Sequence, residues 1–206
     1  MDFPYYLSSL LDLLHNSKWD TSEEIKELVR RISFTIRGDI DEKEQLFGES
    51  EFRYLRRDGL DIPLTKAATG IKLFAVLYRL LQNGHLDKKT LLIIDEPESH
   101  LHPQWVVECA RMLVLIHKKL GTRILIASHD PDMVAAIQAV AIKEKLKPST
   151  HFYIANDLSY FDKDKKEVVL NPQYEFKDLG IEIGDIFNSF NIALECIDQY
   201  GGSHDE

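Results

Sequence analysis

Cysteine is almost absent from this sequence of 206 residues, which contains only Cys109 and Cys196. The two lie far apart and have no CxxC or Cys/His spacing, so no zinc site is encoded and nothing indicates an oxidising compartment. Apolar runs long enough to span a membrane are also lacking. The amino terminus has no basic leader and reaches Asp12 too early for a signal peptide. We therefore expect a cytoplasmic protein that does not bind a membrane.

Basic charge is scarce as well, because 25 Lys and Arg residues stand against 34 Asp and Glu residues, which gives a net charge of −9. An acidic chain repels phosphate backbones, so nucleic acid is not an expected partner of this chain alone. Arg53, Arg56 and Arg57 do cluster beside Tyr54. This pattern favours the solvated face of a hairpin, with nucleic-acid contact as the alternative.

The amino-terminal part, residues 1–64, is predicted to be a helical segment followed by a β-hairpin. Apolar residues between positions 5 and 32 recur at helical spacing in two pieces, and Thr21 begins a capping pattern for the second piece. The acidic stretch at 38–50 is predicted to be irregular. The hairpin is expected to turn at Asp58-Gly59.

Residues 65–206 are predicted to alternate between helices and strands, which is the pattern of an α/β fold with a parallel sheet flanked by helices. The expected elements are a helix from 70, a buried strand at 90–94, a helix at 103–119, a buried strand at 123–127, a helix at 132–145, a strand at 151–155, a hairpin around 163–166 and a helix at 184–200. Both parts are expected to form one compact domain.

The strongest chemical signal is an apolar strand that ends in two adjacent carboxylates, Leu91-Leu-Ile-Ile-Asp95-Glu96. The strand delivers Asp95 to the carboxyl edge of the sheet, where ligands of open α/β sheets bind. A carboxylate at that edge can hold Mg²⁺ directly or through water. Glu96 can then polarise a water molecule that attacks the γ-phosphate of ATP. This is the Walker B arrangement.

A histidine at the end of the next predicted strand strengthens this signal. Ser99-His100-Leu101-His102-Pro103 follows the carboxylates and leads into a helix, and the following strand ends in Ser128-His129-Asp130. Parallel strands joined by one helix have their carboxyl ends at the same edge, so Glu96 and His129 are predicted to face one ligand. A histidine at that position can hydrogen-bond a γ-phosphate.

The segment from about residue 65 to residue 155 resembles the carboxyl-terminal half of ABC-type ATPases of the AAA_21 group, which are relatives of the SMC, recombination-repair and OLD-family ATPases. The resemblance implies an ABC-ATPase-like fold with ATP and Mg²⁺ as cofactors. It also implies that Asp95 is the magnesium ligand, Glu96 the catalytic carboxylate and His129 the switch histidine.

By the same resemblance, the loop before the helix at residue 70 is the ABC signature, which grips a γ-phosphate held by the opposite subunit. Helix N–H groups and the helix dipole suit such an anion. Ala68 stands in place of the usual serine, and Thr69 is the candidate replacement for its hydroxyl. Residues 99–102 match the D-loop, with His102 where many ABC proteins have aspartate. The expected nucleotide-binding residues are Ala68, Thr69, Gly70, Lys72, Ser99 and His100.

The phosphate-binding Walker A loop is missing from this sequence, because no glycine is followed by Lys-Ser or Lys-Thr. Without the N–H groups and lysine of that loop, the β- and γ-phosphates lose their principal hold. Either another polypeptide supplies the loop or the chain is a truncated remnant. The expected partner is a Walker A-containing half or a full-length ATPase relative, and a homodimer is also possible.

Two alternatives to an ATP-hydrolysing lobe stay open at this point. The first is a catalytically inactive module for dimerisation or regulation, which the missing Walker A loop and Ala68 favour. The second is a nucleotide-independent metal hydrolase that uses Asp95, Glu96 and nearby histidines. Glu98, His100 and His102 could suggest a metal site, although a turn rich in polar residues explains them more simply.

Overall fold

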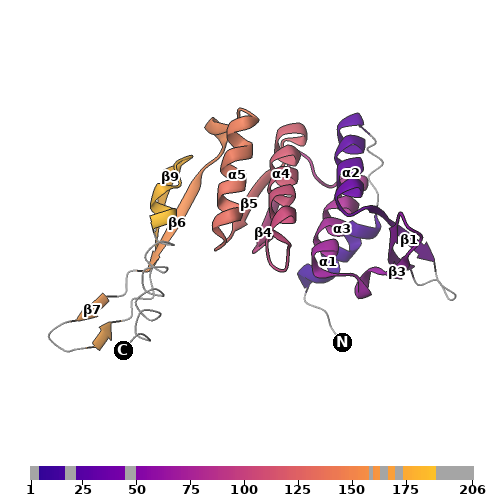
Figure 1. Cartoon of the computed structure of the whole chain (residues 1–206), viewed down its shortest axis with the longest axis horizontal. Helices are drawn as coiled ribbons and strands as arrows, with labels where there is room; N and C mark the ends of the chain where they lie inside the picture. Colours follow the sequence, from indigo (N-terminus) through magenta and orange to yellow (C-terminus); the bar gives the residue numbers. More distant parts are fainter. Residues whose placement is uncertain are drawn as a thin grey trace, which may run out of the picture. The chain divides into compact units, whose positions relative to one another are not determined.

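The computed structural model describes residues 5–16, 22–44, 50–157, 160–162, 167–169 and 174–188. Contacts divide the chain into two compact units, Met1–Val140 and Ala141–Glu206. The boundary predicted at residue 64 falls inside the first unit. This unit combines helices with a parallel and an antiparallel sheet (Figure 1), and the α/β fold class predicted from the sequence is therefore confirmed.

The first two helices are α1 (Tyr5–His15) and α2 (Glu23–Thr35), and they match the two helical pieces expected from the apolar spacing. Ser22 caps α2, because its side chain accepts a hydrogen bond from the backbone N–H of Ile25 at 3.4 Å. The expected start at Thr21 lies outside the described residues. Two acidic residues in the first turn of α2 suit the positive end of its dipole.

A small antiparallel sheet follows, made of β1 (Gly38–Glu44), β2 (Ser50–Arg56) and β3 (Asp61–Pro63). The predicted turn at Asp58-Gly59 is confirmed, and Gly59 has the positive φ of +95° that such a turn requires. The prediction of irregular structure was wrong for residues 38–44. Asp39 and Asp41 are exposed while Ile40 is buried opposite Tyr54, so pairing and burial outweigh the low strand propensity of acidic residues.

A short 3₁₀ turn, η1 (Leu64–Lys66), leads into α3 (Thr69–Gln82). Residues at the end of α3 donate hydrogen bonds to the end of α1. The Arg79 guanidinium donates to the carbonyl of Leu14 at 2.9 Å and 3.1 Å, and the Asn83 amide donates to the same carbonyl at 2.7 Å. Arg79 also pairs with Glu42 on β1 at 2.7 Å. These donors satisfy carbonyls that the end of a helix leaves without intrahelical partners.

The core of the first unit lies between α2, α3 and α4 (Pro103–Leu120). As predicted, α4 begins at Pro103 and ends before Gly121, which has a φ of +71°. Phe74 is fully buried and meets the ring of Trp105 edge-on at 5.6 Å. The largest fully buried side chains are Leu28, Ile32, Ile36, Tyr54, Phe74, Leu77, Leu81, Met112, Leu113, Ile116 and Met133.

Two parallel strands, β4 (Leu91–Asp95) and β5 (Arg123–Ala127), flank α4 in the chain. They pair in register from Leu91 opposite Arg123 to Asp95 opposite Ala127, which confirms the predicted neighbouring parallel strands. Leu92, Ile94, Ile124 and Ile126 pack against the helical core. The expectation of two fully buried strands was wrong, because alternate residues on both strands are exposed on the other face.

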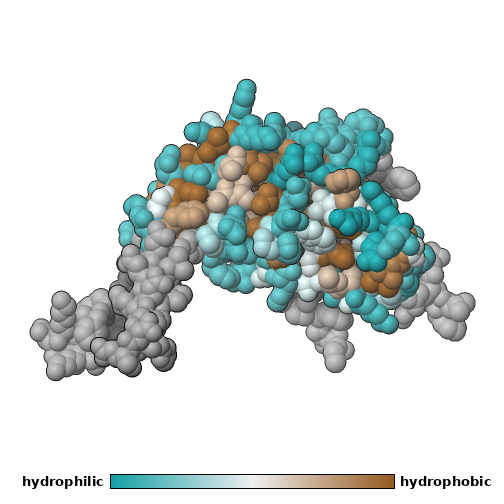
Figure 2. Space-filling view, in the orientation of Figure 1, coloured by the Kyte–Doolittle hydropathy of each residue, from teal (hydrophilic) through white to brown (hydrophobic). Residues whose placement is uncertain are grey.

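The next helix, α5 (Pro131–Lys143), confirms the helix predicted over 132–145, and apolar residues are visible along it in Figure 2. Its sequence consists mainly of alanine, valine and isoleucine, which explains this colour. Figure 1 shows α4 and α5 side by side over one face of β4 and β5. Among the helices that the structure describes, none is both long and apolar enough to cross a bilayer.

The second unit contains a short 3₁₀ turn and two antiparallel strand pairs. The turn is η2 (Lys147–Ser149), and the pairs are β6 (Phe152–Asp157) with β9 (Tyr174–Gly180) and β7 (Tyr160–Asp162) with β8 (Glu167–Val169). The predicted strand at 151–155 is therefore present as β6. We expected this strand to extend the parallel sheet. That expectation was wrong, because β6 pairs antiparallel with β9.

The tail was predicted to contain a hairpin and a final helix. The β7–β8 pair confirms the hairpin, although its turn at 163–166 lies outside the described residues. Residues 184–188 are helical. The rest of the helix predicted at 184–200 lies outside the residues that the structure describes.

We expect Phe74→Ala to lower the free energy of unfolding by about 3–5 kcal/mol, because it removes a fully buried ring from the core. Phe34→Ala is the matched control, since the Phe34 side chain is 73% exposed and its loss should change stability by less than about 0.5 kcal/mol. Urea unfolding followed by circular dichroism measures both. Equal losses in the two variants would contradict this description of the core.

Candidate active site

The site is built where β4 ends. Asp95 is the last residue of this strand and is exposed. Glu96 follows with a left-handed φ of +46°, and its backbone N–H donates to the carbonyl of Ala127 at 2.8 Å. This hydrogen bond continues the β4–β5 pairing one residue past the strand. A non-glycine residue with such a φ is uncommon and often marks a functional turn.

Two side chains hold the carboxylate of Glu96, one at each oxygen. His129 Nδ1 lies 3.0 Å from Glu96 Oε1, and the Ser99 hydroxyl donates to Glu96 Oε2 at 3.1 Å. The side chains of His129 and Glu96 stay open to solvent, with 76% and 49% of their surfaces exposed. The sequence-based prediction that Glu96 and His129 share one edge of the sheet is confirmed. A carboxylate fixed at both oxygens and open to solvent can accept a proton from a water molecule.

A second bridge between the two loops was missed by the sequence reasoning, which treated Glu98 as part of a polar turn. Glu98 is only 7% exposed, and its Oε1 accepts a hydrogen bond from the Ser128 hydroxyl at 2.7 Å. The Ser128 oxygen in turn accepts from the N–H of Asp130 at 3.1 Å. The bridge thus connects the residues on either side of His129 to the loop of Glu96. The serine directly before His129 was the feature of the sequence that could have indicated this bridge.

The other oxygen of Glu98 is buried and has no hydrogen-bond partner among the residues that the structure describes. Cys109 of α4 is also buried, and its burial together with the nearby Glu98 charge raises the pKa of the thiol to about 12. Cys109 therefore stays protonated and packs as a small apolar residue. Burying a carboxylate that has one unsatisfied oxygen costs free energy of folding. A residue that carries this cost needs a compensating role, and we interpret that role as holding the two loops together.

His102 and His100 both have local structural roles in the loop that leads to α4. His102 is the N-cap of α4, and its Nδ1 accepts from the backbone N–H of Gln104 at 3.3 Å. Aspartate commonly does this at an N-cap, so a histidine in its place keeps the capping interaction. His100 has a φ of +64° and turns the chain toward the helix.

The predicted signature residues lie at the start of α3. Ala68 is the N-cap and makes no side-chain capping bond, and Thr69 and Ala68 are exposed. Gly70 is buried, and a Cβ atom there would lie 2.8 Å from Leu101 Cδ2. The absence of a side chain at Gly70 thus allows α3 to pack against the loop after β4. Lys72 is partly exposed one turn further along.

No group of three or more histidine, cysteine, aspartate or glutamate residues converges into a metal site within the described part of the chain. The Glu98, His100 and His102 side chains instead have the separate positions given above. Asp95 remains suited to Mg²⁺, because this ion usually takes one or two carboxylates together with waters and substrate phosphates.

Two of the three arginines considered for nucleic-acid contact, Arg53 and Arg56, are paired with neighbouring acids. Arg53 pairs with Asp61 at 2.6 Å and with Glu51 at 2.8 Å, and Arg56 pairs with Asp58 at 2.7 Å. Tyr54 is buried, with its hydroxyl donating to the backbone carbonyl of Ile36. This arrangement agrees with the solvated hairpin face that the sequence favoured.

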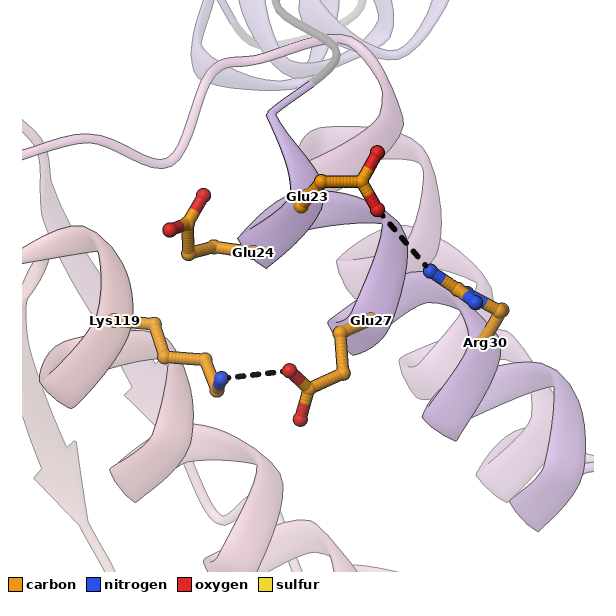
Figure 3. Close-up of a pocket in the computed structure, with 5 residues that line it drawn as sticks. All are labelled: Glu23, Glu24, Glu27, Arg30 and Lys119. Carbon is orange, nitrogen blue, oxygen red and sulfur yellow. Dashed lines mark hydrogen bonds and ion pairs between the residues drawn. The ribbon is translucent and has the colours of Figure 1, made fainter.

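A shallow hollow of about 460 Å³ lies between the start of α2 and the end of α4 (Figure 3). The Lys119–Glu27 ion pair crosses it at 2.8 Å, whereas the Arg30–Glu23 pair, at 3.6 Å, lies within α2. Lys119 is at the opposite end of α4 from Pro103, about 25 Å along the helix, so this hollow is separate from Glu96 and His129.

Residues 10–135 match the AAA_21 family, described as "AAA domain, putative AbiEii toxin, Type IV TA system". This match covers more than half of the 206 residues, and the chain belongs to that family.

Solved structures of SMC ATPases share this fold. One, from work on ATP-driven dimerization and DNA stimulated activation of SMC ATPases, has a TM-score of 0.54 at 10% identity and covers 93% of this chain and 94% of that one. The Smc head domain of Pyrococcus yayanosii, with its coiled coil and joint, has a TM-score of 0.53 at 10% identity. This comparison covers 91% of this chain and 30% of that one.

A shorter match connects the chain to ABC transporters. The energy-coupling factor transporter ATP-binding protein EcfA2 of Clostridium perfringens is 48% identical over 44 residues. That stretch is 21% of this chain and 15% of the transporter protein, so the match covers a small part of both.

The Glu98–Ser128 bridge can be tested with a double-mutant cycle. Ser128→Ala should lower the free energy of unfolding by about 1–3 kcal/mol, because it removes the donor to a buried carboxylate. Adding Glu98→Met should recover part of that loss, so the two effects should not add. Chemical denaturation gives the four stabilities.

Ser99→Ala is the control, because its exposed hydrogen bond to Glu96 should contribute less than about 1 kcal/mol. Strict additivity of Ser128→Ala and Glu98→Met would contradict the bridge.

Proposed function

We propose that this chain is the lobe of an ABC-type ATPase that supplies the magnesium ligand and the catalytic carboxylate, and that another half supplies the phosphate-binding loop. The observation that carries this proposal is the position of Glu96. It directly follows Asp95 at the sheet edge and is held by His129 at 3.0 Å and Ser99 at 3.1 Å. Family membership and the SMC-type fold support the same reaction class.

Each residue has a distinct role in the proposed reaction. Asp95 would hold Mg²⁺, and the chemistry that this ion supplies when bound is neutralisation of charge on the β- and γ-phosphates of ATP. Glu96 orients the attacking water and accepts its proton. In its doubly protonated form, His129 would donate through Nδ1 to Glu96 and through Nε2 to an oxygen of the γ-phosphate, because a neutral imidazole has a single N–H.

The start of α3 would contribute to a nucleotide held by the opposite subunit. Ala68 offers no side-chain cap, so the first N–H groups of α3 can serve an anion. Thr69 and Lys72 would add a hydroxyl and a positive charge, and Ser99 and His100 would approach the nucleotide from the D-loop. This arrangement implies a dimer, either with a second copy or with a full-length relative.

Two observations favour an inactive dimerisation or regulatory module as a second candidate. The sequence has no Gly-Lys-Ser/Thr, and Ala68 lacks the signature hydroxyl. Against it stands the Glu96 arrangement, since a scaffold has no need of a carboxylate held at both oxygens in an open site. No observation favours the metal hydrolase.

The chain alone is expected to bind ATP–Mg²⁺ weakly and to release no detectable phosphate, because the principal hold on the β- and γ-phosphates is missing. Isothermal titration calorimetry and a phosphate-release assay measure both properties. Micromolar affinity for ATP, or clear turnover by the pure chain, would contradict the need for a second half.

With the phosphate-loop half present, Glu96→Gln should lower turnover by about 10²–10⁴-fold while ATP binding is retained, because glutamine cannot accept the proton of the water. Asp95→Asn should weaken both ATP–Mg²⁺ binding and turnover, because it weakens the metal site. ATP affinity and phosphate release distinguish the two effects.

Glu108→Gln provides the matched control. This glutamate lies on α4 beside Arg111 at 3.7 Å, away from the sheet edge, and its replacement should leave binding and turnover unchanged. Turnover of Glu96→Gln at the level of the unmodified protein would mean that Glu96 is not the catalytic carboxylate.

A further inference from the structure

Two side-chain contacts join the loop after β4 to the loop after β5, and one is exposed while the other is buried. The outer contact joins Glu96 to His129 at 3.0 Å, and both side chains are open to solvent. The inner contact joins the buried Glu98 carboxylate to the Ser128 hydroxyl at 2.7 Å. Because Ser128 directly precedes His129, a movement of the inner contact displaces the outer one.

The outer contact by itself is too weak to hold the imidazole of His129 in place. The His129 side chain is 76% exposed, so little packing is available to fix its rotamer. An exposed pair of this kind contributes little, because water screens the attraction and both side chains lose rotational freedom when they meet. The distance of 3.0 Å to Glu96 therefore depends on where the backbone at His129 is held.

The backbone at His129 is held through the residues on either side of it. Exposed and partly buried residues alternate along β5, and the alternation continues through Ser128, which is partly buried, and His129, which is exposed. Consecutive side chains of an extended backbone point to opposite sides, so Ser128 faces the core when His129 faces solvent. The Ser128 hydroxyl donates to Glu98 and accepts from the N–H of Asp130 at 3.1 Å. One oxygen atom thus fixes the residues before and after the histidine.

Glu98 is itself fixed, because it lies in the turn that carries Glu96. The N–H of Ser99 donates to the carbonyl of Glu96 at 3.0 Å, and the N–H of Leu101 donates to the carbonyl of Glu98 at 2.9 Å. Burial strengthens the hydrogen bond between Glu98 and Ser128 relative to the outer contact, because water does not compete for it. The inner contact is therefore the stronger of the two.

We infer that Glu98 is a positioning residue of the hydrolysis site, which acts through Ser128 to hold the imidazole of His129 against Glu96. The inference rests on the proposed function and adds a buried residue that controls the geometry of the site from the core side. Glu98 acts as a hydrogen-bond acceptor, and its charge is not required, because the Ser128 hydroxyl needs only an oxygen to donate to. Loss of either partner should release His129 while the fold persists.

The tautomer of His129, measured in the full chain without nucleotide, tests this inference. At about pH 9, where an ordinary imidazole is neutral, donation to Glu96 requires the proton on Nδ1, whereas a free imidazole in water carries it mainly on Nε2. The chemical shifts of the two ring nitrogens distinguish these forms in long-range proton–nitrogen correlation NMR, with His129→Gln for assignment. We expect Nδ1 protonation in the unmodified chain and mainly Nε2 protonation in Ser128→Ala and in Glu98→Met.

Glu98→Gln and Ser33→Ala are the matched controls. Glutamine keeps an acceptor oxygen for Ser128 and should preserve Nδ1 protonation, which methionine cannot do. The Ser33 hydroxyl is also largely buried and donates to a different carboxylate, that of Asp39, at 2.6 Å. Ser33→Ala should therefore remove a comparable hydrogen bond and leave His129 unchanged, which separates positioning from a general loosening of the fold.

Four results would overturn the inference. The first is Nε2 protonation of His129 in the unmodified chain. The second is Nδ1 protonation retained in Ser128→Ala or in a folded Glu98→Met. The third is loss of Nδ1 protonation in Ser33→Ala, which would mean that any destabilisation releases the imidazole. The fourth is the same loss in Glu98→Gln, which would mean that Glu98 acts through its charge. Ser128→Ala removes a single oxygen atom and decides the test if Glu98→Met does not fold.

Turnover provides the second measurement. With the phosphate-loop half present, Ser128→Ala should lower kcat roughly 10- to 100-fold and leave KM within about twofold, because a displaced catalytic group slows the chemical step more than it weakens binding. Ser33→Ala should change neither constant. An altered tautomer in Ser128→Ala with full turnover, while Glu96→Gln is inactive, would mean that the position of His129 does not matter to hydrolysis and would also overturn the inference.

Failure of the positioning inference can be told apart from failure of the proposed function, because the tautomer is measured without nucleotide. If Ser128→Ala alters the tautomer of His129 but Glu96→Gln keeps full turnover, the structural link stands and the proposed function fails. If the tautomer stays the same in Ser128→Ala and Glu96→Gln abolishes turnover, only the positioning inference fails.

Discussion

The parallel pairing of β4 with β5 is the constraint on which the candidate site depends. Five residue pairs hold the strands in register, and the Glu96 N–H continues the pairing to the carbonyl of Ala127. That last hydrogen bond sets the left-handed turn at Glu96 and places its carboxylate next to His129. A shift of one residue in this register would turn the side chains of the shifted strand to the other face, so Glu96 and His129 would no longer meet.

The loops after the two strands are joined by a second, buried interaction. Glu98 accepts from Ser128, and Ser128 accepts from the N–H of Asp130, which in turn caps α5 through the N–H of Met133. His129 therefore has a fixed residue on each side although its own side chain is exposed. The structure thus combines a rigid frame with an open carboxylate and imidazole, which suits a site completed by another element.

Departures from the ABC pattern can be judged by the physical role of each position. His102 stands where aspartate is common, and it still accepts the capping hydrogen bond of α4. A Cβ atom at Gly70 would lie 2.8 Å from Leu101 Cδ2 and 3.3 Å from the Trp105 ring, so the leucine side chain would have to shift to accept it. Ala68 is different, because the serine hydroxyl is lost and no capping bond replaces it.

Much of this protein was determined by local sequence alone. Apolar spacing, the Asp58-Gly59 turn, Pro103 and Gly121 specified the helices and the hairpin, because capping and turn residues act through neighbouring backbone groups. The run from Leu91 to Glu96, followed by Ser128-His129, specified the acidic pair and histidine at one sheet edge, because strands joined by one helix end at the same edge.

Tertiary structure decided the features that depend on distant partners. Residues 38–44 form a strand only because β2 pairs with them, and β6 pairs with β9 and not with β5. Burial of Glu98 depends on Ser128, 30 residues away, and the exposure of Ile93 depends on which helices cover the sheet. Strand pairing and burial are sums over contacts between segments far apart in the chain, and no local pattern encodes which of those contacts will form.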